Sequence, residues 1–338
     1  MQILLVLFVA MFIRARLWTV TALILLIIFG FLSLTFGMKN SLVVFLEVIV
    51  NYDKTNPEHI IFISHLARVL VAVSVGASLA LAGFIMQLQY KNDLADPTLM
   101  GVSDGSALAI VIGMIFMPNL TMLGRIIFSV IGSFLAYIII SYIYKIVFLG
   151  QSRLTFPLIG IVISMLLSSM TTFLVSYYNI AQSVNSWYNS RLYRVSFSDV
   201  VYFWPILLLL IFLIVLLRKQ MDIYSYGHSI TTSIGMERIH WENFYSVCVV
   251  ILTGVSVAIV GRIAFVGLVI PHIVKLSIGK KYAASVFFVP LTGGIFVLMS
   301  DYLSRYINYP FETPIGVVIA LVGVPIFLYL IRRGATVH

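Results

Sequence analysis

Residues 60–88 read IIFISHLARVLVAVSVGASLALAGFIMQL. This stretch holds one full charge, Arg68, and exceeds the roughly 20 apolar residues that carry an α-helix across a bilayer. Lipid offers no partner to backbone polar groups, so a segment of this kind is typical of a membrane-spanning helix. Small residues such as Gly76, Ala77 and Gly83 allow neighbouring helices to approach closely.

The rest of the chain has the same character. Of its 338 residues, 61% are hydrophobic and 10% are charged, whereas a soluble domain carries about 45–50% apolar and about 25% charged residues. Ten helices of roughly 20 residues would use about 200 residues, which is close to the hydrophobic share of this chain. The composition therefore excludes a soluble enzyme, a disordered protein and a disulfide scaffold. The only cysteine, Cys248, lies inside an apolar run.

Apolar runs separated by polar breaks predict an all-α integral membrane protein with about ten transmembrane helices in a single domain, residues 1–338. The expected spans cover about residues 17–37, 60–88, 98–117, 122–149, 156–178, 200–217, 243–260, 263–278, 284–304 and 314–331. Residues 1–13 are apolar but too few to span, so we expect an N-terminal extension, with Met1 or Met11 as the start. Residues 220–242 are the longest polar stretch, which we expect outside the bilayer.

Basic residues set the expected orientation. Ten spans place both ends of the chain on one side of the membrane, and most of the 21 lysines and arginines fall on that side. Because cytoplasmic loops carry the basic excess, we expect cytoplasmic termini in a multi-pass protein in contact with membrane lipid. The same rule accounts for the net charge of +9 without a nucleic-acid partner.

Motifs of several other chemistries are missing. The only Gly-Lys pair, Gly279-Lys280, lacks the upstream glycine of a phosphate-binding loop, and no His-Glu-x-x-His motif is present. We therefore expect no catalytic, cofactor-binding or metal-binding residues, which disfavours an integral-membrane enzyme. An ion-coupled secondary transporter normally keeps ionisable residues at mid-membrane. Among the acids only Glu47 is a candidate for a span centre, so that class is the weaker alternative.

Four blocks of sequence occur in a characteristic order. They are residues 65–87, with HLARVL, GA and LAG; residues 92–101, NDLADPTLMG; residues 261–272, GRIAFVGLVIPH; and residues 301–325, with DYLSR, PFETPIGVV and GVP. Together these blocks resemble the FecCD-type family of iron-chelate and vitamin B12 importer permeases. These proteins are the inner-membrane components of binding-protein-dependent ABC transport systems.

The resemblance implies a permease that forms a translocation path with a second permease, as a homodimer or a heterodimer. It also implies two ATP-binding subunits on the cytoplasmic side and an extracytoplasmic substrate-binding protein, in a bacterial cell membrane. The permease would be no enzyme itself, because its partners hydrolyse the ATP. A ferric siderophore is the expected cargo, and the same importer type carrying haem or cobalamin is the alternative.

The ATPase contact is expected in the polar segment 220–242, parts of which resemble the family's coupling region. The resemblance implies ATPase contacts for Gly227, His228, Ser229, Ile234, Gly235, Met236, Glu237 and Arg238. The family usually has acidic residues at the positions of His228 and Ser229. Between the fourth and fifth spans, Ser152 and Arg153 occupy the position of the family's cytoplasmic gate.

The binding-protein contact is expected at the opposite ends of the helices. Arg68 and Arg305 match arginines that contact binding-protein carboxylates in the family, and the guanidinium fork suits paired bonds to a carboxylate. His65 stands where the family has another arginine, so one docking charge is expected to be weaker or pH-dependent. Asp301 and Glu312 also match family positions, and for these we expect structural roles.

Overall fold

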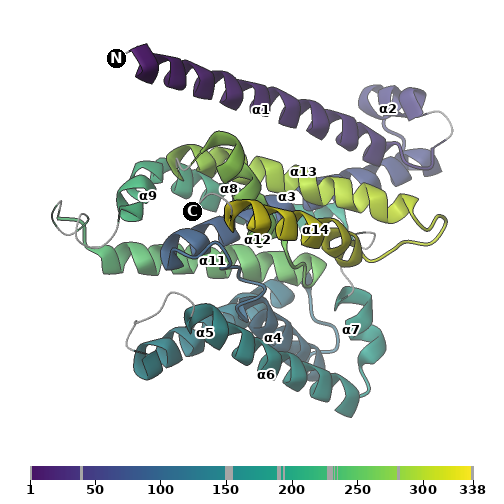
Figure 1. Ribbon diagram of the computed structural model, residues 1–338. Helices are drawn as coiled ribbons and strands as arrows, with labels where there is room; N and C mark the ends of the chain where they lie inside the picture. The colour runs from purple at the N-terminus through teal and green to yellow at the C-terminus, as the bar shows by residue number, and fades with distance from the viewer. Residues whose placement is uncertain are drawn as a thin grey trace.

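The computed structural model describes residues 2–38, 41–148, 155–188, 192, 195–226, 231, 233, 235–279 and 282–335. Throughout these residues, the regular elements are helices, as Figure 1 shows. Ten of them match the ten expected spans: α1 (Gln2–Leu34), α3 (Pro57–Tyr90), α4 (Val102–Phe116), α5 (Met122–Phe148), α6 (Thr155–Tyr177), α8 (Phe197–Leu216), α11 (Arg238–Val260), α12 (Val266–Ile278), α13 (Tyr282–Tyr306) and α14 (Ile315–Ala335). The all-α prediction is confirmed.

Three shorter helices were not predicted. They are α2 (Ser41–Val50), α7 (Ala181–Tyr188) and α9 (Arg218–Ser225). Each follows a long helix closely and is too short to cross a bilayer, so hydropathy alone does not distinguish it from a loop. The described part of residues 1–13 is helical and continuous with α1, and its role as an N-terminal extension stays a prediction.

The centre of the bundle is α3, which packs against α11, α12 and α13 (Figure 1). Glycines make these crossings close: a Cβ atom added to Gly76 would meet the Gly293 carbonyl of α13, and one added to Gly83 would meet the backbone of Gly267 on α12. Close backbone approach through small residues is how helices associate in lipid. By contrast, α1 and α6 leave most of their surface uncovered.

Two ends of the bundle can be distinguished in Figure 1. Both chain termini and α9 lie toward the left, and α2 and α7 lie toward the right. We call these the α9 end and the α2 end. Termini at the same end agree with an even number of crossings, while the cytoplasmic location of that end stays a prediction.

Two helices begin inside the bundle. At about 1.5 Å per residue, α4 with 15 residues and α12 with 13 residues are shorter than the roughly 30 Å hydrocarbon core. Both were expected to start earlier. Asp96 delays α4 because its carboxylate accepts the amide hydrogens of Thr98 and Leu99. Gly261 and Phe265, with φ angles of 78° and 70°, keep the chain irregular before α12.

A charged pair joins the first turn of α4 to the irregular stretch before α12, near the middle of α6, and the sequence did not lead us to expect it. Asp104 in the first turn of α4 pairs with Arg262 at 2.5 Å. The neighbouring Ser106 bonds to Ser133, near the middle of α5. The sequence singles out neither Asp104 nor Arg262, and among the acids it indicates only Glu47 as a candidate for a span centre.

Candidate functional site

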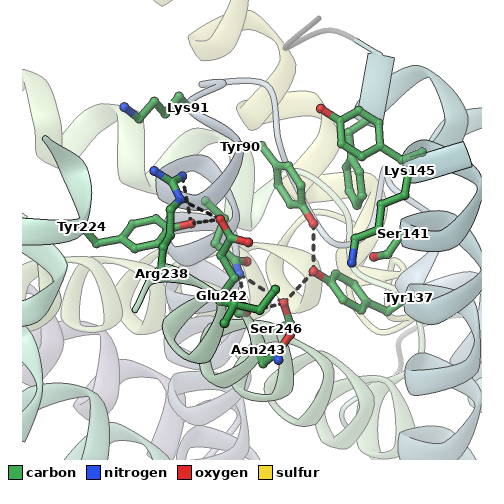
Figure 2. Close-up of a pocket in the computed structure, with 14 residues that line it drawn as sticks. Tyr90, Lys91, Tyr137, Ser141, Lys145, Tyr224, Arg238, Glu242, Asn243 and Ser246 are labelled. Carbon is green, nitrogen blue, oxygen red and sulfur yellow. Dashed lines mark hydrogen bonds and ion pairs between the residues drawn. The ribbon is translucent and has the colours of Figure 1, made fainter. Parts of the chain in front are cut away.

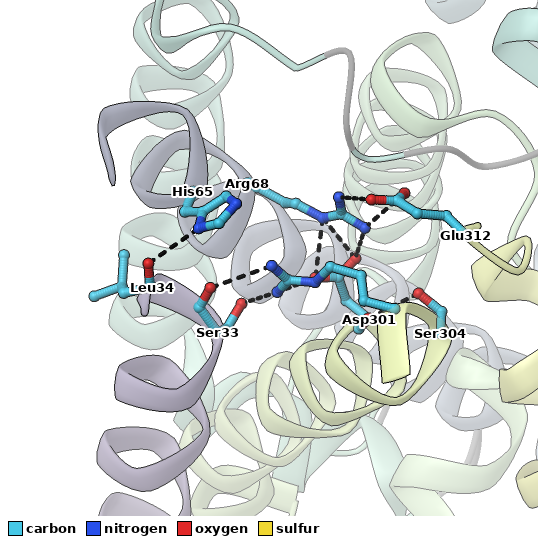
Figure 3. A network of polar contacts seen from close by, with 8 residues as sticks. Ser33, Leu34, His65, Arg68, Asp301, Ser304 and Glu312 are labelled. Atoms are coloured by element: carbon cyan, nitrogen blue, oxygen red, sulfur yellow. Dashed lines mark hydrogen bonds and ion pairs between the residues drawn. The ribbon is translucent and has the colours of Figure 1, made fainter. Parts of the chain in front are cut away.

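Four charged side chains meet at the α2 end (Figure 3). Arg68 on α3 donates from Nε and Nη2 to the Asp301 carboxylate of α13, at 2.9 and 2.8 Å. The same guanidinium donates from Nη1 and Nη2 to Glu312, at 2.7 and 3.1 Å. Arg305, one turn beyond Asp301, donates to that carboxylate at 2.9 Å. Two guanidinium groups thus share two carboxylates, and we call these four residues the arginine–carboxylate cluster.

The end of α1 closes this cluster on one side. Arg305 donates from Nη1 to the carbonyl oxygen of Ser33 at 3.2 Å and from Nη2 to the Ser33 hydroxyl. Its guanidinium carbon lies 5.1 Å from the centre of the Phe36 ring. The His65 ring nitrogen Nδ1 lies 3.0 Å from the carbonyl oxygen of Leu34. Sequence reasoning did not place the end of α1 here, because these contacts join residues more than 30 positions apart.

The predicted docking residues are therefore neighbours, but their charges are already paired. Arg68 is 5% exposed and Arg305 is 3% exposed, whereas the Glu312 side chain is 31% exposed. A carboxylate from another protein would have to replace Glu312 or Asp301 to reach either arginine. Asp301 and Glu312 hold the arginines, as their expected structural roles require. Docking by Arg68, Arg305 and His65 stays a prediction.

A pocket of about 480 Å³ opens at the α9 end (Figure 2). It lies where the ends of α3, α5, α6, α9 and α11 converge. Its lining combines aromatic rings with both signs of charge, namely Gln89, Tyr90, Lys91, Tyr137, Ser141, Tyr144, Lys145, Phe156, Tyr224, Arg238, Ile239, Glu242, Asn243 and Ser246.

An ion pair joins the start of α11 to α9 at this pocket. Arg238 donates from Nε to the Glu242 carboxylate at 2.7 Å, and its guanidinium carbon lies 4.5 Å from the centre of the Tyr224 ring. The Tyr224 hydroxyl donates to the same carboxylate at 3.1 Å. Burial raises the pKa of Tyr224, so the hydroxyl keeps its proton and remains a donor. The predicted coupling residue Arg238 is thus part of a structured contact.

A chain of polar contacts continues from this ion pair to α6. Gln89 on α3 donates to the Glu242 carbonyl oxygen at 2.9 Å and to the Ser246 hydroxyl at 3.1 Å. The Ser246 and Tyr137 hydroxyls lie 2.6 Å apart, and those of Tyr137 and Tyr90 lie 2.9 Å apart. Figure 2 shows the last two hydroxyls turned toward one another.

The chain of contacts ends on a ring at the start of α6. Tyr90 stacks on Phe156, with 3.8 Å between ring centres. Phe156 is the second residue of α6, directly after the stretch predicted as the gate. Sequence reasoning missed Tyr137 and Ser246, which are single polar positions within predicted spans, and it did not single out Glu242, the last residue of the predicted polar segment.

The other predicted residues at the α9 end divide into two groups. Six lie outside the described residues: Gly227, His228, Ser229, Ile234, Ser152 and Arg153. Of those described, Gly235 has a left-handed φ of 78°. The Met236 amide donates to the Thr231 carbonyl oxygen at 2.9 Å, and Glu237 pairs with His240 at 2.8 Å on the surface. ATPase contact by these residues stays a prediction.

Among the described residues, no group of three or more His, Cys, Asp or Glu side chains is placed to hold a metal ion. The carboxylates of Asp301, Glu312 and Glu242 pair with arginines instead.

Comparison with known proteins identifies relatives across nearly the whole chain. The model of the FecCD transport family matches residues 24–333. The iron-uptake system permease protein FeuB of Bacillus subtilis is 38% identical over 304 residues, which cover 89% of this chain and 91% of FeuB. The vitamin B12 import system permease protein BtuC of Photorhabdus laumondii is 32% identical over 79% of each chain. A solved metal-chelate type ABC transporter in an inward-facing conformation has the same fold, with a TM-score of 0.79, 24% identity, and coverage of 94% of this chain and 99% of that one.

Proposed function

This chain belongs to the FecCD transport family of ABC importer permeases, and we propose that the importer it serves carries a ferric siderophore. The observation that carries the proposal is the higher identity to the iron-uptake permease than to the vitamin B12 permease, over a larger share of the chain. Haem and cobalamin are the competing cargoes. Membership in this family removes the ion-coupled secondary transporter from consideration.

As a permease subunit, the chain works in a multi-pass membrane complex with ATPase subunits, a substrate-binding protein and another permease. It hydrolyses no ATP itself. We propose two ATP-binding subunits and one further permease, either a second copy of this chain or a homologue. The surface of α6 is largely uncovered by the rest of the chain. This supports a second permease, because a helix whose uncovered face carries both polar and apolar residues requires a partner protein or a water-filled space.

The ATPase is proposed to dock at the α9 end, which would be cytoplasmic. There the ion pair of Arg238 and Glu242 joins α9 to α11, and the contacts through Tyr137 continue to the start of α6. A displacement of the coupling segment by the ATPase would be transmitted to α6 through these packed side chains. The gate proposed at Ser152 and Arg153 would lie immediately before that helix.

The binding protein is proposed to dock at the α2 end, over the arginine–carboxylate cluster. Glu312 is the most exposed member of that cluster, so a docking carboxylate would take its place on Arg68. Charge reversal by Arg305→Glu is expected to weaken docking, and a compensating reversal on the binding protein should restore it. Because Arg305 touches Asp301, each variant is first checked for normal unfolding. Unchanged docking in a folded Arg305→Glu variant would contradict the role of this residue.

The cargo is tested in proteoliposomes that contain the whole importer and its binding protein. Uptake is measured for radiolabelled ferric siderophores, haem and cobalamin, with an ATPase variant that lacks the phosphate-loop lysine as control. We expect ferric siderophore uptake that needs both ATP and the binding protein. Uptake of cobalamin or haem in preference to every siderophore would overturn the proposed cargo, and uptake that persists in the ATPase control would overturn the mechanism.

A further inference from the structure

We propose that Arg262, held by Asp104 beside a row of hydroxyl groups on α6, is a contact point for an anionic ferric chelate within the translocation path. The inference rests on the proposed function and adds the chemical class of the cargo. It also assigns a role to the ion pair of Asp104 and Arg262, which has no part in the proposed binding-protein docking or ATPase coupling.

The depth of this pair follows from the helices around it. Asp104 contacts the Ser164 hydroxyl, which lies near the middle of α6. Two residues further along α4, Ser106 bonds to Ser133 near the middle of α5. Arg262 precedes α12, whose first residues pack on Gly83, well inside α3. Non-helical backbone at such depth occurs where it is buried in protein or lines a water-filled cavity, and broken helices of this kind form substrate sites in other transporters.

The two partners of the ion pair differ in exposure. The Asp104 side chain is fully buried, whereas that of Arg262 is 28% exposed, and their closest atoms are 2.5 Å apart. Asp104 is therefore a fixed anchor that cannot meet a ligand. The guanidinium of Arg262 has several donors and reaches the surface, so it can pair with an oxygen acceptor while Asp104 holds it in place.

Hydroxyl groups surround the exposed side of Arg262. A surface hollow of about 530 Å³ is lined by Ser164, Met165, Ser168, Ser169, Thr172 and Arg262. The Arg262 Nη1 atom lies 3.5 Å from the Ser168 hydroxyl. A charged side chain facing lipid at this depth is costly, and such residues almost always face a bundle interior or an aqueous cavity. We infer that this face of α6 lines the path shared with the second permease.

The charge balance of the site indicates its ligand. Carboxylate and catecholate oxygens carry the negative charge that a guanidinium binds, and bonds to charged groups are the stronger ones. The exposed guanidinium of Arg262 faces the ligand while the buried Asp104 offsets its charge from behind, so the site holds an anionic chelate weakly enough to release it onward. A neutral chelate gains little from this contact.

The first test measures charge at the site without any cargo. Ser168→Cys is introduced into an importer whose other subunits lack cysteine; Cys248, the only natural cysteine of this chain, is buried. Labelling rates are compared for a negatively and a positively charged methanethiosulfonate. In a background with both Arg262→Gln and Asp104→Asn, we expect the preference for the negative reagent to fall about fivefold. The inference would be overturned if the cysteine at position 168 were labelled in neither the resting nor the ATP-cycling importer. It would also be overturned if the preference for the negative reagent stayed unchanged in the double-variant background.

The second test measures transport. Uptake of ferric dicitrate, a ferric tris-catecholate and a neutral ferric trihydroxamate is compared in wild type, in the Arg262→Gln/Asp104→Asn double variant and in Arg262→Lys. The double variant removes both charges together, which avoids leaving Asp104 buried and unpaired. Arg125→Gln, at an arginine on α5 outside the hollow, is the matched control.

We expect the double variant to lower uptake of the anionic chelates about tenfold, with unchanged docking of the binding protein. Uptake of the neutral chelate should change less than twofold, and Arg262→Lys should recover part of the loss. An equal effect of the double variant on all carried chelates would overturn the inference and leave the proposed function standing. The same holds if the wild-type importer carries only the neutral chelate. Wild type that carries no ferric chelate would overturn both.

Discussion

Replacing Asp301 by asparagine tests how the arginine–carboxylate cluster holds the α2 end together. The Asp301 side chain is 1% exposed and receives bonds from both Arg68 and Arg305. Asparagine keeps the shape but removes the charge, which leaves two buried guanidinium groups with Glu312 as their only carboxylate in the cluster. Removing one partner of a buried ion pair destabilises a protein by about 3–5 kcal/mol.

The same reasoning predicts a smaller effect for Glu312→Gln. This side chain is 31% exposed and contacts Arg68 alone within the cluster. Solvent screens an exposed pair, so its loss is expected to be about 1 kcal/mol. The double variant Asp301→Asn/Arg305→Gln removes one charge of each sign, and it should be more stable than Asp301→Asn alone.

The measurement is unfolding of the purified chain in mixed micelles, with helix content followed by circular dichroism during titration with sodium dodecyl sulfate. A loss of 3 kcal/mol corresponds to a change of roughly a hundredfold in the unfolding equilibrium. Equal effects of Asp301→Asn and Glu312→Gln, or a double variant less stable than Asp301→Asn, would refute the claim that buried charge balance stabilises this end.

Three further changes test the packing and the coupling. Gly76→Ala inserts a methyl group against the Gly293 carbonyl and should destabilise the folded chain by about 1–3 kcal/mol in the same titration. Gly316→Ala is the control, because no atom lies within 4 Å of the added methyl group, and it should not destabilise the chain. Equal effects of the two variants would contradict the close crossing of α3 and α13. Gly235→Val forces a branched residue into a φ of +78° at a position with open space around it. Chelate uptake should therefore fall several-fold while ATP hydrolysis continues. Normal uptake at normal expression would contradict the coupling role of Gly235. Tyr137→Phe removes the hydroxyl that links Tyr90 of α3 to Ser246 of α11. We expect more ATP to be hydrolysed per chelate carried. An unchanged ratio of ATP hydrolysed to chelate carried would exclude coupling through Tyr137.

Much of the fold was predictable because insertion into lipid depends on local composition. Ten apolar runs correspond to ten helices in the described structure, and most boundaries fall within a few residues of the expected ones. The late starts of α4 and α12 have local causes. The Asp96 carboxylate holds the turn before α4, and the left-handed φ of Phe265 delays α12. Neither feature appears in hydropathy, which counts apolar side chains and ignores backbone turns.

The candidate sites were predictable only in part. Sequence resemblance placed Arg68 and Arg305 at one end of the molecule, but not their burial. Their burial depends on Asp301 and on the end of α1, which are far away in the chain. The sequence likewise did not bring Arg262 to Asp104, because the two residues are far apart in the chain and meet only through packing.

The sequence by itself thus determined the class of protein, the order of its apolar helices and the family. These follow from the balance between apolar residues and charge, and from motifs that are continuous in the chain. Only the tertiary structure decided that Arg68 is neutralised by carboxylates on other segments and that Asp104 meets Arg262 at mid-depth. A buried charge is tolerable only beside its partner, and packing rather than chain order brings these partners together.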